Sequence, residues 1–193
     1  FNSYHSNILL LILIAFISVI PLFIAFDKIS EEVYPLVILV VPFVLLSYNT
    51  FVGNYIHISD AVQEFYFIKL VIKNGFWDQT IPSTLNNMLG IVILPPIFSQ
   101  ITDINLTWIY KAIAPFLSLL IPLGLYQTYQ KKWNKKIAFL ASFLYFSFFT
   151  FFTWCAVTMK MLFAGIFLTL LILLITDKEI EPIKKAFLSI ILS

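Results

Sequence analysis

The sequence predicts an all-α protein, a polytopic bundle of transmembrane helices. Hydrophobic residues make up 61% of the 193 residues and charged residues only 11%, too few charges to cover the surface of a soluble domain. Several apolar runs reach the roughly 17–25 residues that a helix needs to cross a bilayer. No run shows the alternating pattern of a membrane β-barrel, so the spans are predicted to be helices.

Six apolar runs are predicted to be spans or the start of one. They cover residues 7–26, 34–51, 106–126, 137–152, 159–175 and 183 onward. Residues 84–101 are also apolar, but Pro95 and Pro96 break that run near its end, and we expect it to lie at the interface rather than to cross. Because the chain starts at Phe1 and ends inside an apolar run, we expect residues 1–193 to be a single transmembrane domain, a fragment of a larger chain.

Two lysine clusters predict which loops of the chain face the cytoplasm. Four lysines lie within residues 131–136 and three more within 178–185, and two predicted spans separate the clusters. The positive-inside rule makes residues 130–136 and 177–185 cytoplasmic in a multi-pass protein of the cell membrane. Counting back along the spans, residues 52–105 form an extracytoplasmic loop with interfacial helices.

Composition excludes several kinds of site. Cys155 is the only cysteine, which rules out intrachain disulfides and thiolate metal clusters. The five glycines form no phosphate-cradling loop, and the chain has no arginine for bidentate phosphate recognition. Nucleic acid is not an expected partner, because one lysine cluster next to a span is better explained by topology.

The most charged segment of the predicted outer loop is an amphipathic helix over residues 60–73. Its apolar stripe consists of Ala61, Phe65, Ile68 and Ile72. We expect Asp60, Gln63 and Glu64 to lie on the opposite side. One interpretation is a capped helix that rests on the outer leaflet. The other is a site facing a lipid-linked substrate, with Asp60 as general base and Glu64 holding an acceptor hydroxyl or sharing a divalent cation.

Three further polar residues are candidates for ligand contacts. Lys160 begins the span that follows the second predicted outer loop, where it would bind a phosphate or extend outward to the interface. Asn86 would donate a hydrogen bond to a lipid headgroup or cap a loop. Lys111 lies early in its span and is expected to reach the interface with its long side chain.

Several sequence blocks follow one another in a fixed order. YIHISDAVQEFYF, which contains Asp60 and Glu64, precedes NGFWD, LNNMLGIVILPPIFSQITDI, WIYKAIAPFLSLLIPLGLYQTYQ and KKIAFLASFLYFSFFTFFT. In combination these blocks resemble the GT-C superfamily of membrane glycosyltransferases. The likeness is closest to an archaeal family of predicted multi-pass membrane proteins of unknown function.

The resemblance implies a GT-C-like fold that transfers a sugar from a polyprenyl-phosphate-linked donor to an extracytoplasmic acceptor. Asp60 matches the loop aspartate and Glu64 the following glutamate of such enzymes, and both are catalytic candidates. Lys160 and Asn86 are the substrate-binding candidates. The resemblance also implies a divalent cation, Mg²⁺ or Mn²⁺, with Asp60 as a ligand. A transporter or flippase, or a non-catalytic membrane subunit with Asp60 as a helix cap, remains the alternative.

Overall fold

The structure of the chain is a computed structural model that describes residues 8–51, 55–56, 59–155 and 158–192. The first residue of the predicted span 7–26 lies outside the described residues, as do five residues of the predicted loop 52–105. Within the described ranges every regular element is a helix. The all-α prediction is therefore confirmed.

The helices vary widely in length. In chain order they are α1 (Ile8–Ala25), η2 (Glu31–Val33), α2 (Tyr34–Phe51), α3 (Ser59–Asn74), α4 (Leu89–Val92), α5 (Leu94–Thr102), α6 (Leu106–Ser118), α7 (Leu120–Gln130), α8 (Lys135–Ser147), η3 (Phe151–Cys155), α9 (Met159–Thr176) and α10 (Pro182–Leu192). Here η2 is a 3₁₀ turn and η3 a π-helical turn.

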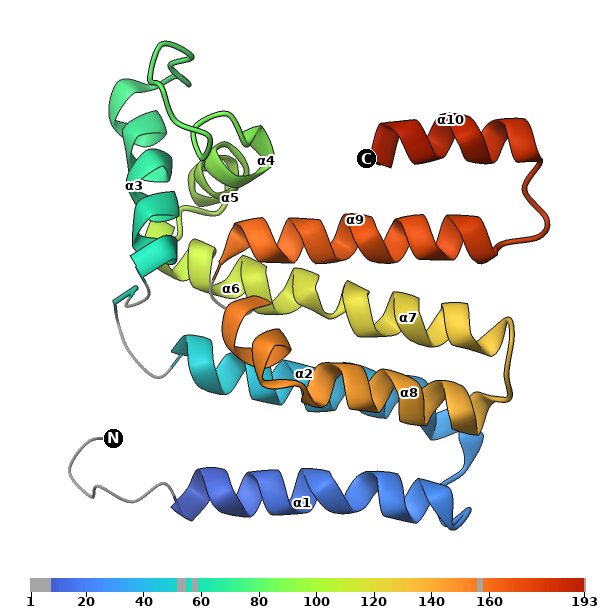
Figure 1. Cartoon of the computed structure of the whole chain (residues 1–193). Coiled ribbons are helices and arrows are strands. Elements are labelled where there is room, and N and C mark those ends of the chain that lie inside the picture. Colours follow the sequence, from blue (N-terminus) through green and yellow to red (C-terminus); the bar gives the residue numbers. More distant parts are fainter. Residues whose placement is uncertain (1–7, 52–54, 57–58, 156–157, 193) are drawn as a thin grey trace.

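The long helices run back and forth in one bundle. Figure 1 shows α1, α2, α8, α9, α10 and the α6–α7 pair lying along one common direction. Helices α3, α4 and α5 gather at one end of this bundle, and α3 runs across the direction of the others (Figure 1). The connections that leave α1, α7 and α9 all lie at the opposite end.

Three stretches are long and apolar enough to cross a membrane: Glu31–Tyr48, Leu106–Gln130 and Met159–Thr176. They overlap the predicted spans at 34–51, 106–126 and 159–175, which are confirmed as helical stretches of membrane length. Pro115 and Pro122 lie in the α6–α7 stretch, where each removes a backbone donor, and the helix is interrupted at Leu119.

The predicted span 137–152 is wrong as a single helix. Helix α8 ends at Ser147, Phe148 takes an extended conformation with ψ 134°, and the chain then turns through η3. The 13 residues of α8 span about 20 Å, short of the roughly 30 Å of a bilayer core. Residues 84–101 divide into turns, α4 and α5, and the apolar stretch Leu89–Thr102 is too short for a span.

The buried side chains form two separate cores. The larger packs α1, α2, α7, α8 and η3 together around residues such as Tyr34, Leu46 and Phe139. The smaller lies where α3 and α4 meet α6 and α9, and it contains Ala61, Ile68, Ile91, Ala114 and Leu162 among others. This second core fixes the end of the bundle that carries the predicted site.

Ion pairs connect the loops at the other end of the bundle. Lys131 pairs with Asp177, and Lys136 pairs with Asp27 at 2.9 Å. These contacts bring the segments 130–136 and 177–185 to one end, opposite α3, as the lysine pattern requires. Exposed pairs of this kind contribute little to stability, so they follow the packing rather than determine it. The membrane side on which they lie stays a prediction.

Two glycines let α7 and α9 approach closely. A Cβ at Gly124 would lie 2.5 Å from Thr169 Cγ2, and a Cβ at Gly165 would lie 2.6 Å from Ile121 Cδ1. The contacts are reciprocal, because each helix supplies one glycine and one side chain. The Thr169 hydroxyl is fixed by its bond to the Gly165 carbonyl at 2.8 Å, whereas Ile121 Cδ1 ends a flexible side chain.

We predict that Gly124→Ala lowers stability by about 1–3 kcal/mol, because the overpacking exceeds the usual gain of about 0.5–1 kcal/mol from removing a helical glycine. Thermal unfolding in detergent measures this. Thr169→Ser, which deletes the clashing methyl group, should restore most of the loss. Gly90→Ala is the control, since its nearest neighbour would be Phe163 at an ordinary 3.6 Å. Equal stability of the Gly124→Ala and Gly90→Ala proteins would contradict the close approach.

Candidate functional site

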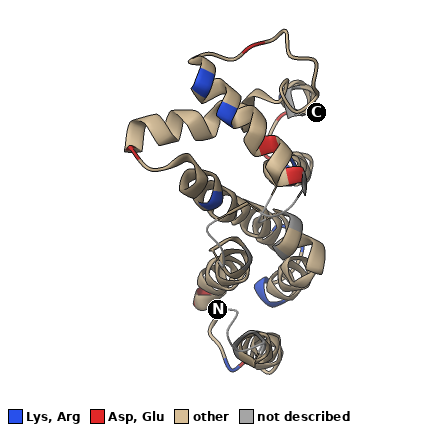
Figure 2. Cartoon of the chain, turned by 90° about the vertical axis from the view of Figure 1, so that its left-hand side faces the viewer, with Lys and Arg blue, Asp and Glu red and all other residues tan. Residues whose placement is uncertain are grey.

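Helix α3 carries the two acidic residues of the predicted site, Asp60 and Glu64. Acidic residues lie near the beginning of this helix and basic residues toward its end, as Figure 2 shows in the view onto that end of the bundle. This order suits the helix dipole. The acidic end meets α6 and α9, so Asp60 and Glu64 are brought against residues far away in the sequence.

Glu64 is completely buried and accepts hydrogen bonds from two other helices. Its Oε2 atom accepts from the Tyr110 hydroxyl of α6 at 2.7 Å and from the Met159 backbone N–H of α9 at 2.8 Å. Its Oε1 atom accepts from the Lys160 backbone N–H at 3.3 Å. A buried carboxylate needs such partners, because leaving it unpaired costs several kcal/mol.

Glu64 caps α9 from another helix. The first amides of a helix have no partner within it, and Thr158 at the N-cap position of α9 makes no capping bond with its side chain. Glu64 supplies the missing acceptor and places negative charge at the positive end of the helix dipole. One carboxylate therefore fixes both the start of α9 and the position of α3.

Asp60 lies one turn before Glu64 and forms an ion pair with Lys160. The Lys160 ammonium lies 2.5 Å from Asp60 Oδ2. The Asp60 side chain is 39% exposed and that of Lys160 is 32% exposed, so both are within reach of a ligand, unlike Glu64. The two residues are 100 positions apart in the sequence, and the Glu64 bond to the Lys160 amide holds them together.

The expected position of Glu64 on the polar side of α3 is wrong. Glu64 is buried on the same face as Ala61 and Ile68, which are three residues before it and four residues after it. Residues with these spacings share one face of a helix, so the spacing places Glu64 inside the apolar stripe. Ile72, expected at the end of that stripe, is 38% exposed.

Asn86 lies apart from this cluster and stabilises its own loop. Its side-chain amide donates to the Asp78 carbonyl at 2.8 Å and more weakly to the Ile81 carbonyl at 3.3 Å. Its backbone carbonyl accepts from the Trp77 indole N–H at 2.9 Å. Asn86 is only 2% exposed, so its side chain holds the loop after α3 closed instead of facing a headgroup.

Sequence reasoning missed Tyr110 and the Met159 amide as partners of Glu64. Tyr110 lies one turn inside a predicted span, where its hydroxyl group needs a hydrogen-bond partner, and this position could have indicated its role. Lys111 does not extend its side chain out of the protein: it is 4% exposed, with its ammonium 5.6 Å from the centre of the Trp108 ring.

The oxygen atoms around Asp60 do not form a binding site for a divalent cation. Mg²⁺ and Mn²⁺ require several oxygen ligands, but the nearby oxygens of Glu64 already accept three hydrogen bonds. Asp60 has the Lys160 ammonium against it, and a cation there would be repelled. Among the described residues, no group of three or more His, Cys, Asp or Glu side chains could hold a metal ion.

No known protein family, curated protein sequence or solved structure matches this chain. The resemblance to GT-C enzymes therefore rests on the order of the sequence blocks alone. The geometry of Asp60, Glu64 and Lys160 is an independent observation about the same residues.

Tyr110 and Glu64 should be energetically coupled. We predict that Tyr110→Phe and Glu64→Leu each destabilise the protein by more than 1 kcal/mol, because each removes one member of a buried hydrogen bond to a charged group. The double variant should lose less than the sum, by about 0.5–3 kcal/mol, in thermal or denaturant unfolding. Tyr66→Phe is the control, since Tyr66 is 58% exposed on the same helix. Additive losses would contradict the bond.

The stability of the protein should depend on pH through Glu64. Burial raises the pKa of the Glu64 carboxyl above its usual value of 4.5, and the bonds from Tyr110, Met159 and Lys160 only partly oppose this. The unfolded chain therefore loses this proton first, so stability falls as pH rises from 4.5 through the raised pKa. We predict that Glu64→Gln removes this decline. An identical pH profile for both proteins would contradict the shift.

Proposed function

We propose that the protein is a membrane glycosyltransferase that uses a polyprenyl-phosphate-linked sugar as donor. The observation that carries the proposal is the half-exposed pair of Asp60 and Lys160 at one end of a bundle of membrane-length helices. A lipid-linked donor confines its phosphate to the membrane interface. Lys160 is the second residue of a membrane-length helix, which is the level at which such a phosphate would lie.

The two residues have complementary parts in this reaction. The Lys160 ammonium exchanges its partner from the Asp60 carboxylate to the donor phosphate and stabilises the charge that develops on it. Asp60 is thereby released to accept the proton of the acceptor hydroxyl. The acceptor oxygen bonds to the anomeric carbon of the sugar, the bond from that carbon to the phosphate oxygen breaks, and the lipid phosphate leaves with the electron pair.

Glu64 acts in this proposal as a positioning residue. It is buried, and its oxygens are engaged by Tyr110 and the first amides of α9, so it does not touch the substrate. By holding the start of α9 it sets the distance from the Lys160 ammonium to Asp60. The proposed reaction uses no metal ion, because the oxygen atoms around Asp60 do not form a site for one.

The test measures transfer of a radiolabelled sugar from polyprenyl-phosphate donors to membrane acceptors, with the full-length protein in vesicles. Asp60→Asn keeps the shape of the side chain but cannot accept the proton, and transfer should fall by about 10²–10⁴-fold. Lys160→Ala should lower kcat/KM, chiefly through KM for the donor.

The matched controls are Lys69→Ala and Lys73→Ala, which remove basic residues from the far part of α3. These variants should transfer normally. Transfer by the Asp60→Asn protein at the wild-type rate, with equal expression, would refute the assignment.

A further inference from the structure

A pocket lies between the end of α3 and α5. Its volume is about 210 Å³, below the range of about 300–1,000 Å³ for drug-sized ligands, so it suits a group the size of a single ring. Residues from both helices and from the loop between them line it, among them Gly75, Phe76, Trp77, Pro96, Ile97 and Gln100. Nothing in the proposed reaction uses this pocket.

The loop after α3 builds one wall of the pocket. Gly75 ends the helix with φ 77°, a conformation that favours glycine, and a Cβ there would meet no atom within 4 Å. The chain then presents Phe76 and Trp77. The Trp77 indole N–H is bound to the Asn86 carbonyl, so the ring is fixed in place before any ligand arrives. A fixed aromatic ring loses little entropy on binding.

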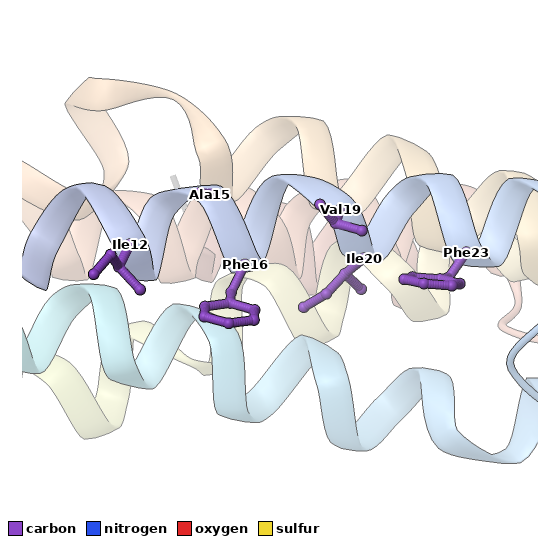
Figure 3. Close-up of a pocket in the computed structure, with 6 residues that line it drawn as sticks. All are labelled: Ile12, Ala15, Phe16, Val19, Ile20 and Phe23. Atoms are coloured by element: carbon purple, nitrogen blue, oxygen red, sulfur yellow. The ribbon is translucent and has the colours of Figure 1, made fainter.

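The lining combines aromatic carbon with polar groups. Phe76 is 62% exposed, and Gln100, also exposed, offers an amide that both donates and accepts hydrogen bonds. A second groove, along α1, is different. Its lining is purely apolar and comes from a single helix, as Figure 3 shows: Ile12, Ala15, Phe16, Val19, Ile20 and Phe23. That groove matches hydrocarbon, whereas the α3–α5 pocket matches a ring with an apolar face and polar edges.

The geometry points to a carbohydrate subsite in the α3–α5 pocket, which takes one uncharged pyranose ring. Such a ring packs its C–H face on aromatic carbon and exchanges hydrogen bonds with an amide such as that of Gln100. No charged side chain among the described residues lines the pocket, which favours a neutral sugar over a phosphate or a sugar acid. The occupant is therefore a neutral sugar unit of a glycan.

This inference rests on the proposed function, since it assigns the pocket to the glycan that takes part in transfer. Ile72 at the pocket is twelve residues beyond Asp60 on the same helix, which corresponds to about 18 Å. The pocket therefore binds a sugar unit remote from the reacting one. Sugar binding there would add affinity for longer acceptors.

The experiment uses the full chain in lipid nanodiscs, labelled with 5-fluorotryptophan, which gives one ¹⁹F resonance for each of the four tryptophans. Trp77→Phe assigns the resonance of Trp77. Methyl α-D-glucopyranoside and methyl N-acetyl-β-D-glucosaminide are titrated, with cyclohexane as the apolar ring of similar size. We expect a saturable shift of the Trp77 resonance by a pyranoside, with a Kd on the order of 1 mM.

Two variants of α5 test whether the sugar binds in this pocket. Ile97→Trp fills the pocket and should weaken the sugar-dependent shift at least about tenfold. Ile101→Trp places the same side chain on the same helix at a position that is 76% exposed and does not line the pocket, and binding should persist. The inference is overturned if neither pyranoside shifts the Trp77 resonance, if cyclohexane shifts it as well as the sugars do, or if Ile97→Trp binds normally.

The experiment separates the two proposals. Sugar binding that persists while Asp60→Asn transfers normally would refute the transferase mechanism and leave the subsite standing. Loss of transfer in Asp60→Asn without any sugar binding at Trp77 would refute the subsite alone.

Discussion

The buried carboxylate of Glu64 is the constraint on which this end of the molecule depends. A carboxylate without exposure must have its oxygens occupied by donors, and here the donors come from α6 and from the first turn of α9. The same bonds satisfy α9 amides that have no partner within their own helix. The same hydrogen bonds therefore satisfy both the carboxylate and the first amides of α9. They hold the crossing helix α3 against the bundle at this point.

The position of the exposed Asp60–Lys160 pair follows from this packing of α3. With Glu64 fixed, Asp60 lies one turn away and the Lys160 side chain reaches it from α9. Apolar packing supports the arrangement, because Phe65 meets the Tyr110 ring edge-on within the smaller core, with 5.6 Å between the ring centres. Farther along α3, the chain turns at Gly75 and returns through the loop closed by Asn86. Both candidate sites thus share one helix, which Glu64 and the smaller core hold against the bundle.

The sequence predicted the helical class, three of its six proposed spans as helices of membrane length, and the extent of α3, because apolar run length and amphipathic spacing are local properties. It also assigned Asp60 and Lys160 to one proposed reaction, but it did not predict that their side chains form an ion pair. It failed at Phe148, where an apolar run continues but the backbone leaves the helix, since hydropathy does not report backbone conformation. The partners of Glu64 were missed because Tyr110 and the Met159 amide are brought close only by tertiary packing.

The most direct test of the central claim is hydrogen exchange at the Met159 and Lys160 amides, measured residue by residue by NMR in nanodiscs. As first-turn amides they have no protection from their own helix, so slow exchange there requires an acceptor from outside. The account predicts slow exchange at both amides in the wild-type protein and fast exchange in Glu64→Leu, with the rest of α9 unchanged. Fast exchange in the wild type, or equal exchange in both proteins, would contradict the role of Glu64.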